Sequence, residues 1–156
     1  MFSKLFSKII VPYDGSSFSK KALSKAIEVA HNLESEIHIV TVVNVGYVSP
    51  PGMLKGLTHS KSDKNSIKKW KKSVKDDTKK MLKKEILRCE SKGISATYKI
   101  LEGNVSDSII DYSKKNKATL IVIGSQGLSG VRKIKILGSV SRKVSELASC
   151  PVLIIR

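Results

Sequence analysis

Short apolar runs alternate along the chain with segments in which apolar residues recur every three or four positions. The runs are rich in valine and isoleucine, which is typical of strands buried on both faces of a sheet. The periodic segments are typical of helices that bury one face and expose the other. The runs predict strands at residues 8–11, 37–43, 95–101, 120–123 and 152–155. The periodic segments predict a helix that begins after Ser16 or Ser17 and ends near residue 33, and helices at 63–91, 105–117 and 139–147.

This order of elements defines the expected fold. Strands and helices that follow one another in this way predict an α/β fold, in which helices cover both faces of a parallel sheet. The length of 156 residues fits a single domain that spans residues 1–156. Residues 44–62 are rich in glycine and proline, and we expect a flexible loop there. In such sheets a ligand binds beyond the carboxyl ends of the strands, where the strand order reverses.

A glycine-rich segment follows the fourth predicted strand. Gly124, Gly127 and Gly130 are spaced by three residues, and Gly138 with Ser139 opens the last predicted helix. Glycine lets the backbone approach a ligand closely, and the first turn of a helix presents free N–H groups to an anion. A strand, a glycine loop and a helix start therefore predict an anion site, for which phosphate is the usual ligand. The spacing matches neither G-x-x-x-x-G-K-[ST] nor G-x-G-x-x-G.

This segment resembles the nucleotide loop of the universal stress protein family, which is written G-x2-G-x9-G-[ST]. Gly124 and Gly127 match its first pair and Gly138-Ser139 its last pair, although ten residues rather than nine separate Gly127 from Gly138. Residues 8–17 and 150–156 resemble the first and last strands of the family. The resemblance implies a Rossmann-like open sandwich with the strand order 3-2-1-4-5. It also implies ATP as the cofactor, with which a Mg²⁺ ion could enter.

The resemblance further implies which residues bind ATP. Asp14 would help to bind the ribose or adenine, the backbone of Val42 would contact adenine, and the glycine loop would hold the phosphates and ribose. The implied ATP-binding residues are Pro12, Tyr13, Asp14, Val42, Ile123, Gly124, Gly127, Gly138, Ser139 and Val140. Simpler structural roles are open for several of them. Asp14 could serve the Asp-Gly turn or cap the helix, Val42 could be a core residue, and Ser139 could be an N-cap.

Charge is the most unusual property of the composition. The formal net charge is +16, and much of the lysine falls within residues 61–84, between apolar residues at helical spacing. This pattern predicts a solvated lysine face on an amphipathic helix. Aromatic residues make up 5% of the chain, and no aromatic-rich strand motif, zinc finger or dsRNA-binding pattern is present, so we expect weak, nonspecific polyanion binding rather than sequence readout. The basic residues after the glycine loop either neutralise phosphates or are surface charges; they are Arg132, Lys133 and Lys135.

The sequence shows no catalytic constellation and no metal site. His31, His38 and His59 fall on a predicted helix, strand and loop, and no nucleophile has a readable base partner. Any ATP hydrolysis would therefore be slow or would need a partner. Cys89 and Cys150 form no C-x-x-C pair, which fits a reducing cytoplasm, and we expect Cys150 to be a buried, inert thiol. No apolar run approaches the roughly 20 residues that span a bilayer, so we expect no membrane association.

The last predicted strand would lie at the margin of the sheet, where unpaired backbone groups favour pairing with another chain. The resemblance implies a homodimer through this strand, about a two-fold axis. The alternative is that residues 2–6 shield this edge within a monomer. The sequence thus predicts a cytoplasmic universal-stress-type protein that binds ATP and acts as a stress sensor or signalling module. One alternative is a dimeric interaction module without nucleotide binding, which the ten-residue spacing favours. Another is a polyanion-binding protein driven by charge.

Overall fold

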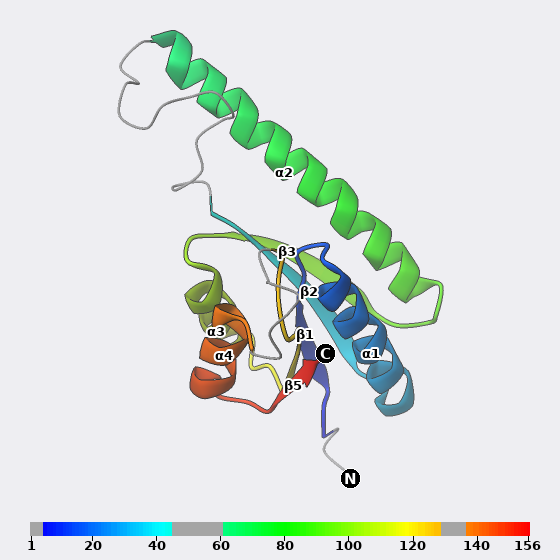
Figure 1. Ribbon diagram of the computed structural model, residues 1–156. Helices are drawn as coiled ribbons and strands as arrows, with labels where there is room; N and C mark the ends of the chain where they lie inside the picture. The colour runs from blue at the N-terminus through cyan, green and yellow to red at the C-terminus, as the bar shows by residue number, and fades with distance from the viewer. Residues whose placement is uncertain (1–4, 45–60, 129–136) are drawn as a thin grey trace.

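The computed structural model describes residues 5–44, 61–128 and 137–156 (Figure 1). Most of the predicted loop at 44–62, with His59, lies outside the described residues, as do Gly130 and the basic residues Arg132, Lys133 and Lys135. Strands and helices alternate along the described chain as the sequence predicted. The elements are β1 (Lys8–Pro12), α1 (Ser17–Leu33), β2 (Glu36–Val43), α2 (Lys61–Glu90), β3 (Ala96–Glu102), α3 (Val105–Lys115), β4 (Leu120–Gly124), α4 (Ser139–Leu147) and β5 (Val152–Ile155).

The five strands form one parallel sheet in the order β3-β2-β1-β4-β5, which confirms the predicted fold and strand order. β1 is central, and its residue Ile9 pairs with Ile37 of β2 and with Leu120 of β4. The chain adds β2 and β3 on one side of β1 and then β4 and β5 on the other. The carboxyl ends of β1 and β4 therefore flank the point where the strand order reverses.

The predicted element boundaries are correct to within a few residues. α2 begins at Lys61, two residues before the predicted start. α3 ends at Lys115 rather than at residue 117. The physical reason at α3 is that Lys117 has a left-handed backbone conformation, with a φ of 53°, which a right-handed helix does not allow.

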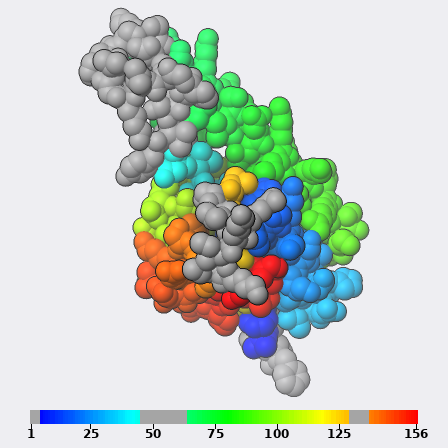
Figure 2. Space-filling view, in the orientation of Figure 1, coloured from blue at the N-terminus to red at the C-terminus, as the bar shows by residue number. Residues whose placement is uncertain are grey.

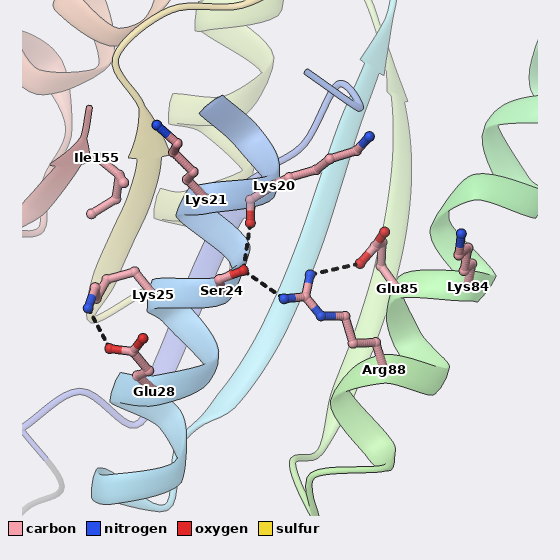
Figure 3. Close-up of a pocket in the computed structure, with 9 residues that line it drawn as sticks. All are labelled: Lys20, Lys21, Ser24, Lys25, Glu28, Lys84, Glu85, Arg88 and Ile155. Carbon is pink, nitrogen blue, oxygen red and sulfur yellow. Dashed lines mark hydrogen bonds and ion pairs between the residues drawn. The ribbon is translucent and has the colours of Figure 1, made fainter. Parts of the chain in front are cut away.

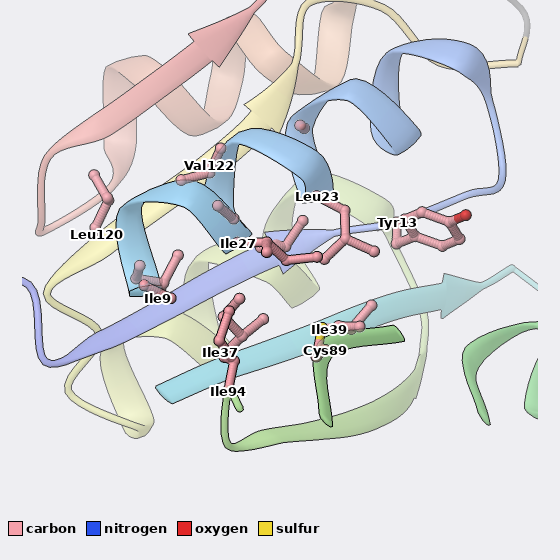
Figure 4. Close-up of a cluster of buried hydrophobic side chains, with 14 of the residues drawn as sticks. Ile9, Tyr13, Leu23, Ile27, Ile37, Ile39, Cys89, Ile94, Leu120 and Val122 are labelled. Carbon is pink, nitrogen blue, oxygen red and sulfur yellow. The ribbon is translucent and has the colours of Figure 1, made fainter. Parts of the chain in front are cut away.

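Helices cover both faces of the sheet, and each pair of helices buries its own hydrophobic cluster. α1 and α2 pack over a cluster that includes Val11 and Leu23, which we call the α1–α2 cluster (Figure 4). α3 and α4 pack on the other face over a cluster that includes Ile10 and Val144. Val11 and Ile10 are neighbours in β1 and serve opposite clusters, because side chains alternate between the faces of a strand. Burial of each such side chain contributes about 1.5–3 kcal/mol, so β1 is stabilised from both sides.

α2 is longer than the face of the sheet that it covers. Its 30 residues form a rod about 45 Å long, and Figure 1 shows its N-terminal half extending past the sheet. The C-terminal half packs on the sheet through Leu82 and Cys89, which are fully buried. Lys79, Lys80 and Lys83 are exposed. The predicted lysine face of this helix is therefore confirmed for the part that the structure describes.

β5 forms one edge of the sheet, and its backbone groups alternate between β4 and the open edge. The carbonyl of Ile155 accepts the N–H of Ser125 at 2.7 Å, so the backbone groups of Ile155 point toward β4. Since every second residue of a strand directs its backbone groups to the same side, the backbone groups of Leu153 also point toward β4. The backbone groups of Val152 and Ile154 therefore face the open edge.

The two cysteines differ in burial. Cys89 is fully buried on the face of α2 that packs on the sheet, and burial raises the pKa of its thiol to about 11. Cys150 is partly exposed, so the prediction of a buried thiol at this position is wrong. Cys150 lies in the short turn between α4 and β5, where the following Pro151 is exposed, and only one side of it is covered. Burial still raises the pKa of the Cys150 thiol above its usual value.

Candidate functional site

A cavity of about 460 Å³ lies at the carboxyl ends of β1, β2 and β4. This is the point where the strand order reverses, and the volume falls within the roughly 300–1,000 Å³ usual for small-molecule sites. All the residues that the family resemblance implied for ATP line this cavity: Pro12, Tyr13, Asp14, Val42, Ile123, Gly124, Gly127, Gly138, Ser139 and Val140. The fold thus brings together residues that lie more than a hundred positions apart in the chain.

Sequence reasoning missed several residues that also line the cavity, namely Ser19, Val40, Thr41, Val105, Ile109, Gln126, Leu128 and Ser141. A signal existed for Val105 and Ile109. They are apolar residues of the first two turns of the helix that follows β3, on the side where β2 ends. Because β3 neighbours β2 in the expected strand order, the first turns of the helix that follows β3 lie near the end of β2. Helical periodicity would then have placed Val105 and Ile109 near Val42.

Asp14 joins the end of β1 to the glycine loop. Its Oδ1 accepts the N–H of Ser16 at 2.9 Å, which closes the Asp-Gly turn. Its Oδ2 accepts the N–H of Leu128 at 3.1 Å. The N-cap of α1 is Ser16, whose hydroxyl accepts the N–H of Ser19, so Asp14 serves the turn and not the cap. A carboxylate accepts about four hydrogen bonds. After these two contacts within the described residues, Asp14 retains acceptor capacity for a ligand.

Tyr13 and Thr41 join the ends of β1 and β2 below the cavity. The Thr41 hydroxyl donates to the Tyr13 carbonyl at 2.6 Å, and the Tyr13 N–H donates to the Val40 carbonyl at 2.8 Å. The ring of Tyr13 packs in the α1–α2 cluster (Figure 4), and its hydroxyl donates to Glu85 at 2.9 Å. Burial raises the pKa of this hydroxyl well above its usual value, and the hydrogen bond to Glu85 adds to the shift. Tyr13 therefore borders the cavity mainly with its backbone.

Ser125, Gly138 and Ser141 hold the two ends of the glycine loop together. The Ser125 carbonyl accepts the N–H of Gly138 at 2.8 Å and the hydroxyl of Ser141 at 2.8 Å. Gly138 is the N-cap of α4 and makes no side-chain cap bond, while Ser139 is the first helical residue. The interpretation of Ser139 as the N-cap is therefore wrong. The Ser125 carbonyl lies 3.3 Å from where a Cβ of Gly138 would stand, which leaves little room for a capping side chain.

Two glycines of the loop are required by close packing. A Cβ at Gly124 would stand 2.8 Å from the backbone carbonyl carbon of Phe18, because α1 starts directly against the end of β4. A Cβ at Gly127 would stand 2.9 Å from Oδ2 of Asp14. Both distances are shorter than side chains adopt, so a larger residue must displace its neighbour. Gly127 thus preserves the contact between Asp14 and the loop.

The lining offers three kinds of contact. Asp14 supplies hydrogen-bond acceptors. The first turn of α4, with the exposed Ser139 hydroxyl, supplies donors and the positive end of a helix dipole. Val42, Val105 and Ile109 supply apolar surface. This combination suits a ligand that carries an apolar ring, hydroxyl groups and an anionic group.

The described residues contain no group of three or more His, Cys, Asp and Glu side chains that could hold a metal ion. His31 is exposed on α1 and His38 lies within β2, and neither lines the cavity. None of the helices in the described ranges is both long enough and apolar enough to cross a bilayer.

The fold and the cavity define an open α/β protein with a cavity at the switch point of its parallel sheet. A model of the universal stress protein family matches residues 5–156, and this chain belongs to that family. It is 34% identical to universal stress protein YxiE of Bacillus subtilis, over 97% of this chain and 100% of that protein. It is 32% identical to universal stress protein MJ0531 of Methanocaldococcus jannaschii, over 97% and 83% of the two chains.

Solved structures share the same fold. Universal stress protein UspA from Lactobacillus plantarum has a TM-score of 0.79 at 20% identity, over 97% of this chain and 98% of that one. The universal stress protein from Archaeoglobus fulgidus in complex with dAMP has a TM-score of 0.65 at 22% identity, over 97% and 99%. A family protein from Arabidopsis thaliana with AMP bound has a TM-score of 0.63 at 22% identity, over 96% and 90%.

Proposed function

We propose that this protein binds ATP in the cavity at the carboxyl ends of β1, β2 and β4, and that the bound state acts as a sensor or signal in the stress response. One observation carries the proposal: Oδ2 of Asp14 accepts the N–H of Leu128 at 3.1 Å. This contact brings the carboxylate that suits ribose hydroxyls directly to the loop that suits phosphates. The family membership of the chain supports the stress-response role.

Adenine nucleotides in similar proteins support the choice of ligand. The Archaeoglobus fulgidus protein is described in complex with dAMP and the Arabidopsis thaliana protein with AMP bound. Their identity to this chain is 22%, so the likeness itself is one of fold. The proposal that this chain also binds an adenine nucleotide therefore rests on the residues that line its own cavity.

The proposal gives each group of lining residues a role. The backbone of Val42 would contact adenine, with Val105 and Ile109 as apolar neighbours, and Asp14 would accept hydrogen bonds from the ribose hydroxyls. The phosphates would lie at Gly127 and Ser139, with the backbones of Ile123, Gly124, Gly138 and Val140 around them. A Mg²⁺ ion would enter with the phosphates, whose oxygens it prefers. Hydrolysis would be slow at most, because the described lining contains no histidine or other evident base paired with a nucleophile.

A second candidate function is a dimeric interaction module that binds no nucleotide. Two observations favour it. The loop between Gly127 and Gly138 has one residue more than the family motif. The N–H of Gly138 is also already used by the Ser125 carbonyl, so this part of the loop offers one donor fewer to a phosphate.

Calorimetric titration with Mg-ATP distinguishes the two functions. Saturable heat is expected for the wild-type protein, and AMP should bind at least tenfold more weakly if the loop holds the outer phosphates. The variant Gly127→Val should lose binding, since its side chain would displace Asp14 and fill the phosphate space. Circular dichroism would verify that the variant is folded. No saturation at millimolar nucleotide would reject ATP binding in favour of the interaction module, and equal affinities for AMP and ATP would reject the role of the loop.

The proposal has three further parts. The first is a homodimer formed through β5, and the second is a cytoplasmic location of a single-domain protein. The third is weak, nonspecific binding of polyanions by the lysines of α2. Each is independent of the nucleotide site, so an experiment that rejects one of them does not reject ATP binding.

A further inference from the structure

A basic groove lies on the outside of the molecule between α1 and α2, and it shares no residue with the nucleotide cavity. It belongs to an open hollow of about 800 Å³ around α1. Figure 3 shows Lys20 and Ser24 extending from α1 toward α2, where Lys84, Glu85 and Arg88 form the opposite side. These five residues define the basic groove. In Figure 2 the green surface of α2 adjoins the blue surface of α1.

Arg88 is fixed at the centre of this groove. Its guanidinium donates to the Ser24 hydroxyl at 2.6 Å and to Oε2 of Glu85 at 3.4 Å. Glu85 is held in turn by the Tyr13 hydroxyl, which donates to its Oε1. The carboxylate is buried, whereas 38% of the arginine side chain is exposed. A guanidinium has five N–H donors, so Arg88 is pre-oriented and retains donors for an anion.

Two lysines flank Arg88 from opposite sides. Lys20 on α1 and Lys84 on α2 are both exposed, and within the described residues neither has a carboxylate partner. The exposed Lys80 and Lys83 continue this charge along α2. Lys80, Lys83, Lys84 and Arg88 therefore place cations over about 12 Å of the helix axis beside the groove.

We infer that the basic groove binds the phosphodiester backbone of duplex nucleic acid, without preference for sequence. A duplex carries one negative charge per about 1.7 Å of its axis, which suits a row of cations along a rod. Arg88 and the two lysines would contact successive phosphates. This inference deepens the proposed polyanion binding by α2 by naming the site and the partner. It does not depend on ATP binding.

The surroundings of the groove disfavour other anionic partners. A single strand would require exposed aromatic rings on which bases stack, and the described lining of the groove contains none. A membrane surface would require an apolar helix face to insert beside the groove, but there, in the C-terminal half of α2, that face is buried through Leu82 and Cys89. An acidic peptide would need apolar side chains as anchors between the two helices, whereas the five residues of the groove are three cations, a serine and a glutamate.

Fluorescence anisotropy with a labelled DNA duplex of roughly 20 base pairs, which is longer than α2, tests the inference. The wild-type protein should bind two unrelated sequences equally. The double variant Lys20→Glu/Lys84→Glu should bind about tenfold more weakly at low salt. Its slope of log affinity against log salt should be smaller by roughly 0.9 for each phosphate that the variant no longer neutralises. Both side chains are exposed, so the fold should tolerate the changes.

The control is Lys114→Glu/Lys115→Glu, which makes the same change of charge on α3, on the other face of the sheet. It should bind the duplex like the wild type. An equal decrease in affinity for both double variants would overturn the groove as the site, because net charge alone would then explain binding. Tighter binding of polyglutamate, of single-stranded DNA or of phosphatidylserine vesicles than of the duplex would overturn the choice of partner. Titration of both variants with Mg-ATP keeps this outcome separate from that of the nucleotide site.

Discussion

At the scale of single residues, two neighbours at the end of β1 contact different parts of the fold. Asp14 contacts the glycine loop through its carboxylate, whereas the Tyr13 hydroxyl contacts Glu85 of α2. Glu85 in turn orients Arg88 in the basic groove. Buried polar groups such as Glu85 are stable only when their hydrogen bonds are made. Tyr13 therefore stabilises the packing of α2 against the sheet.

The variant Tyr13→Phe tests this role. It removes one donor from a buried carboxylate, which should lower the free energy of unfolding by about 1–3 kcal/mol. Urea denaturation monitored by circular dichroism measures the change. Tyr98→Phe is the matched control, because Tyr98 also packs against the α1–α2 cluster but its hydroxyl makes no hydrogen bond with a described residue. Equal stability of Tyr13→Phe and wild type would show that the bond to Glu85 contributes nothing.

We expect His38 on β2 to make the stability of the protein depend on pH. Its Nδ1 lies 3.1 Å from the Tyr112 hydroxyl, and its Nε2 lies 3.5 Å from Glu36, which also pairs with Lys8. Burial lowers the pKa of His38 below 6.5, while Glu36 opposes the shift and Lys8 adds to it. Well above pH 6.5 the imidazole is neutral in both the folded and the unfolded state. As the pH falls below that value, the unfolded chain binds the proton more readily, and the free energy of unfolding decreases.

The variant His38→Gln should therefore lose less stability than the wild type between about pH 7 and about pH 5. Urea denaturation at several pH values measures the two slopes. His31→Gln is the control, since it makes the same substitution at a histidine that is exposed on α1. Parallel pH profiles for His38→Gln and wild type would contradict the prediction.

At the scale of elements, the start of α1 packs directly against the end of β4. Gly124 makes this contact possible, because a Cβ there would stand 2.8 Å from the Phe18 backbone. Backbone atoms of a helix cannot rotate away as a flexible side chain can. The ends of β1 and β4, which flank the candidate site, are therefore held in place by the fit between this strand and this helix.

The variant Gly124→Ala should lower the free energy of unfolding by about 1–3 kcal/mol, since one methyl group must push α1 away from β4. Gly138→Ala is the graded comparison, because its Cβ would stand 3.3 Å from the Ser125 carbonyl and requires a much smaller shift. Thermal or urea denaturation should rank the wild type first, Gly138→Ala second and Gly124→Ala last. The reverse order of the two variants would show that this packing is not rigid.

At the scale of the whole molecule, the open edge of β5 is where a second copy could pair. Val152 and Ile154 direct their backbone groups to this edge, whereas Leu153 directs its groups to β4. A proline at residue 153 would therefore break the β4–β5 ladder instead of the dimer. The side chain of Leu153 is 37% exposed, so a change there can disturb pairing without removing a core residue.

We expect the wild-type protein to be a dimer at micromolar concentration and Leu153→Lys to be a monomer. Two lysines facing each other across paired edges repel, and charged side chains blunt an edge strand. Light scattering gives the mass of each. Leu147→Lys makes the same chemical change on the exposed surface of α4 and should remain dimeric. A wild-type mass of one chain would reject the dimer.

The sequence by itself determined the order and type of the elements, because short β-branched runs and helical periodicity favour strands and helices through local interactions. The glycine motif and the family resemblance also assigned residues to a site, and all of them line one cavity, which is lined as well by residues that they missed, such as Val105 and Ile109. Tertiary structure decided what depends on contacts between distant segments. It gave Asp14 its partner Leu128, joined Tyr13 to Glu85, made Gly138 rather than Ser139 the cap of α4, and left Cys150 partly exposed. These outcomes depend on how segments that are separate in the chain pack together, which no local pattern in the chain encodes.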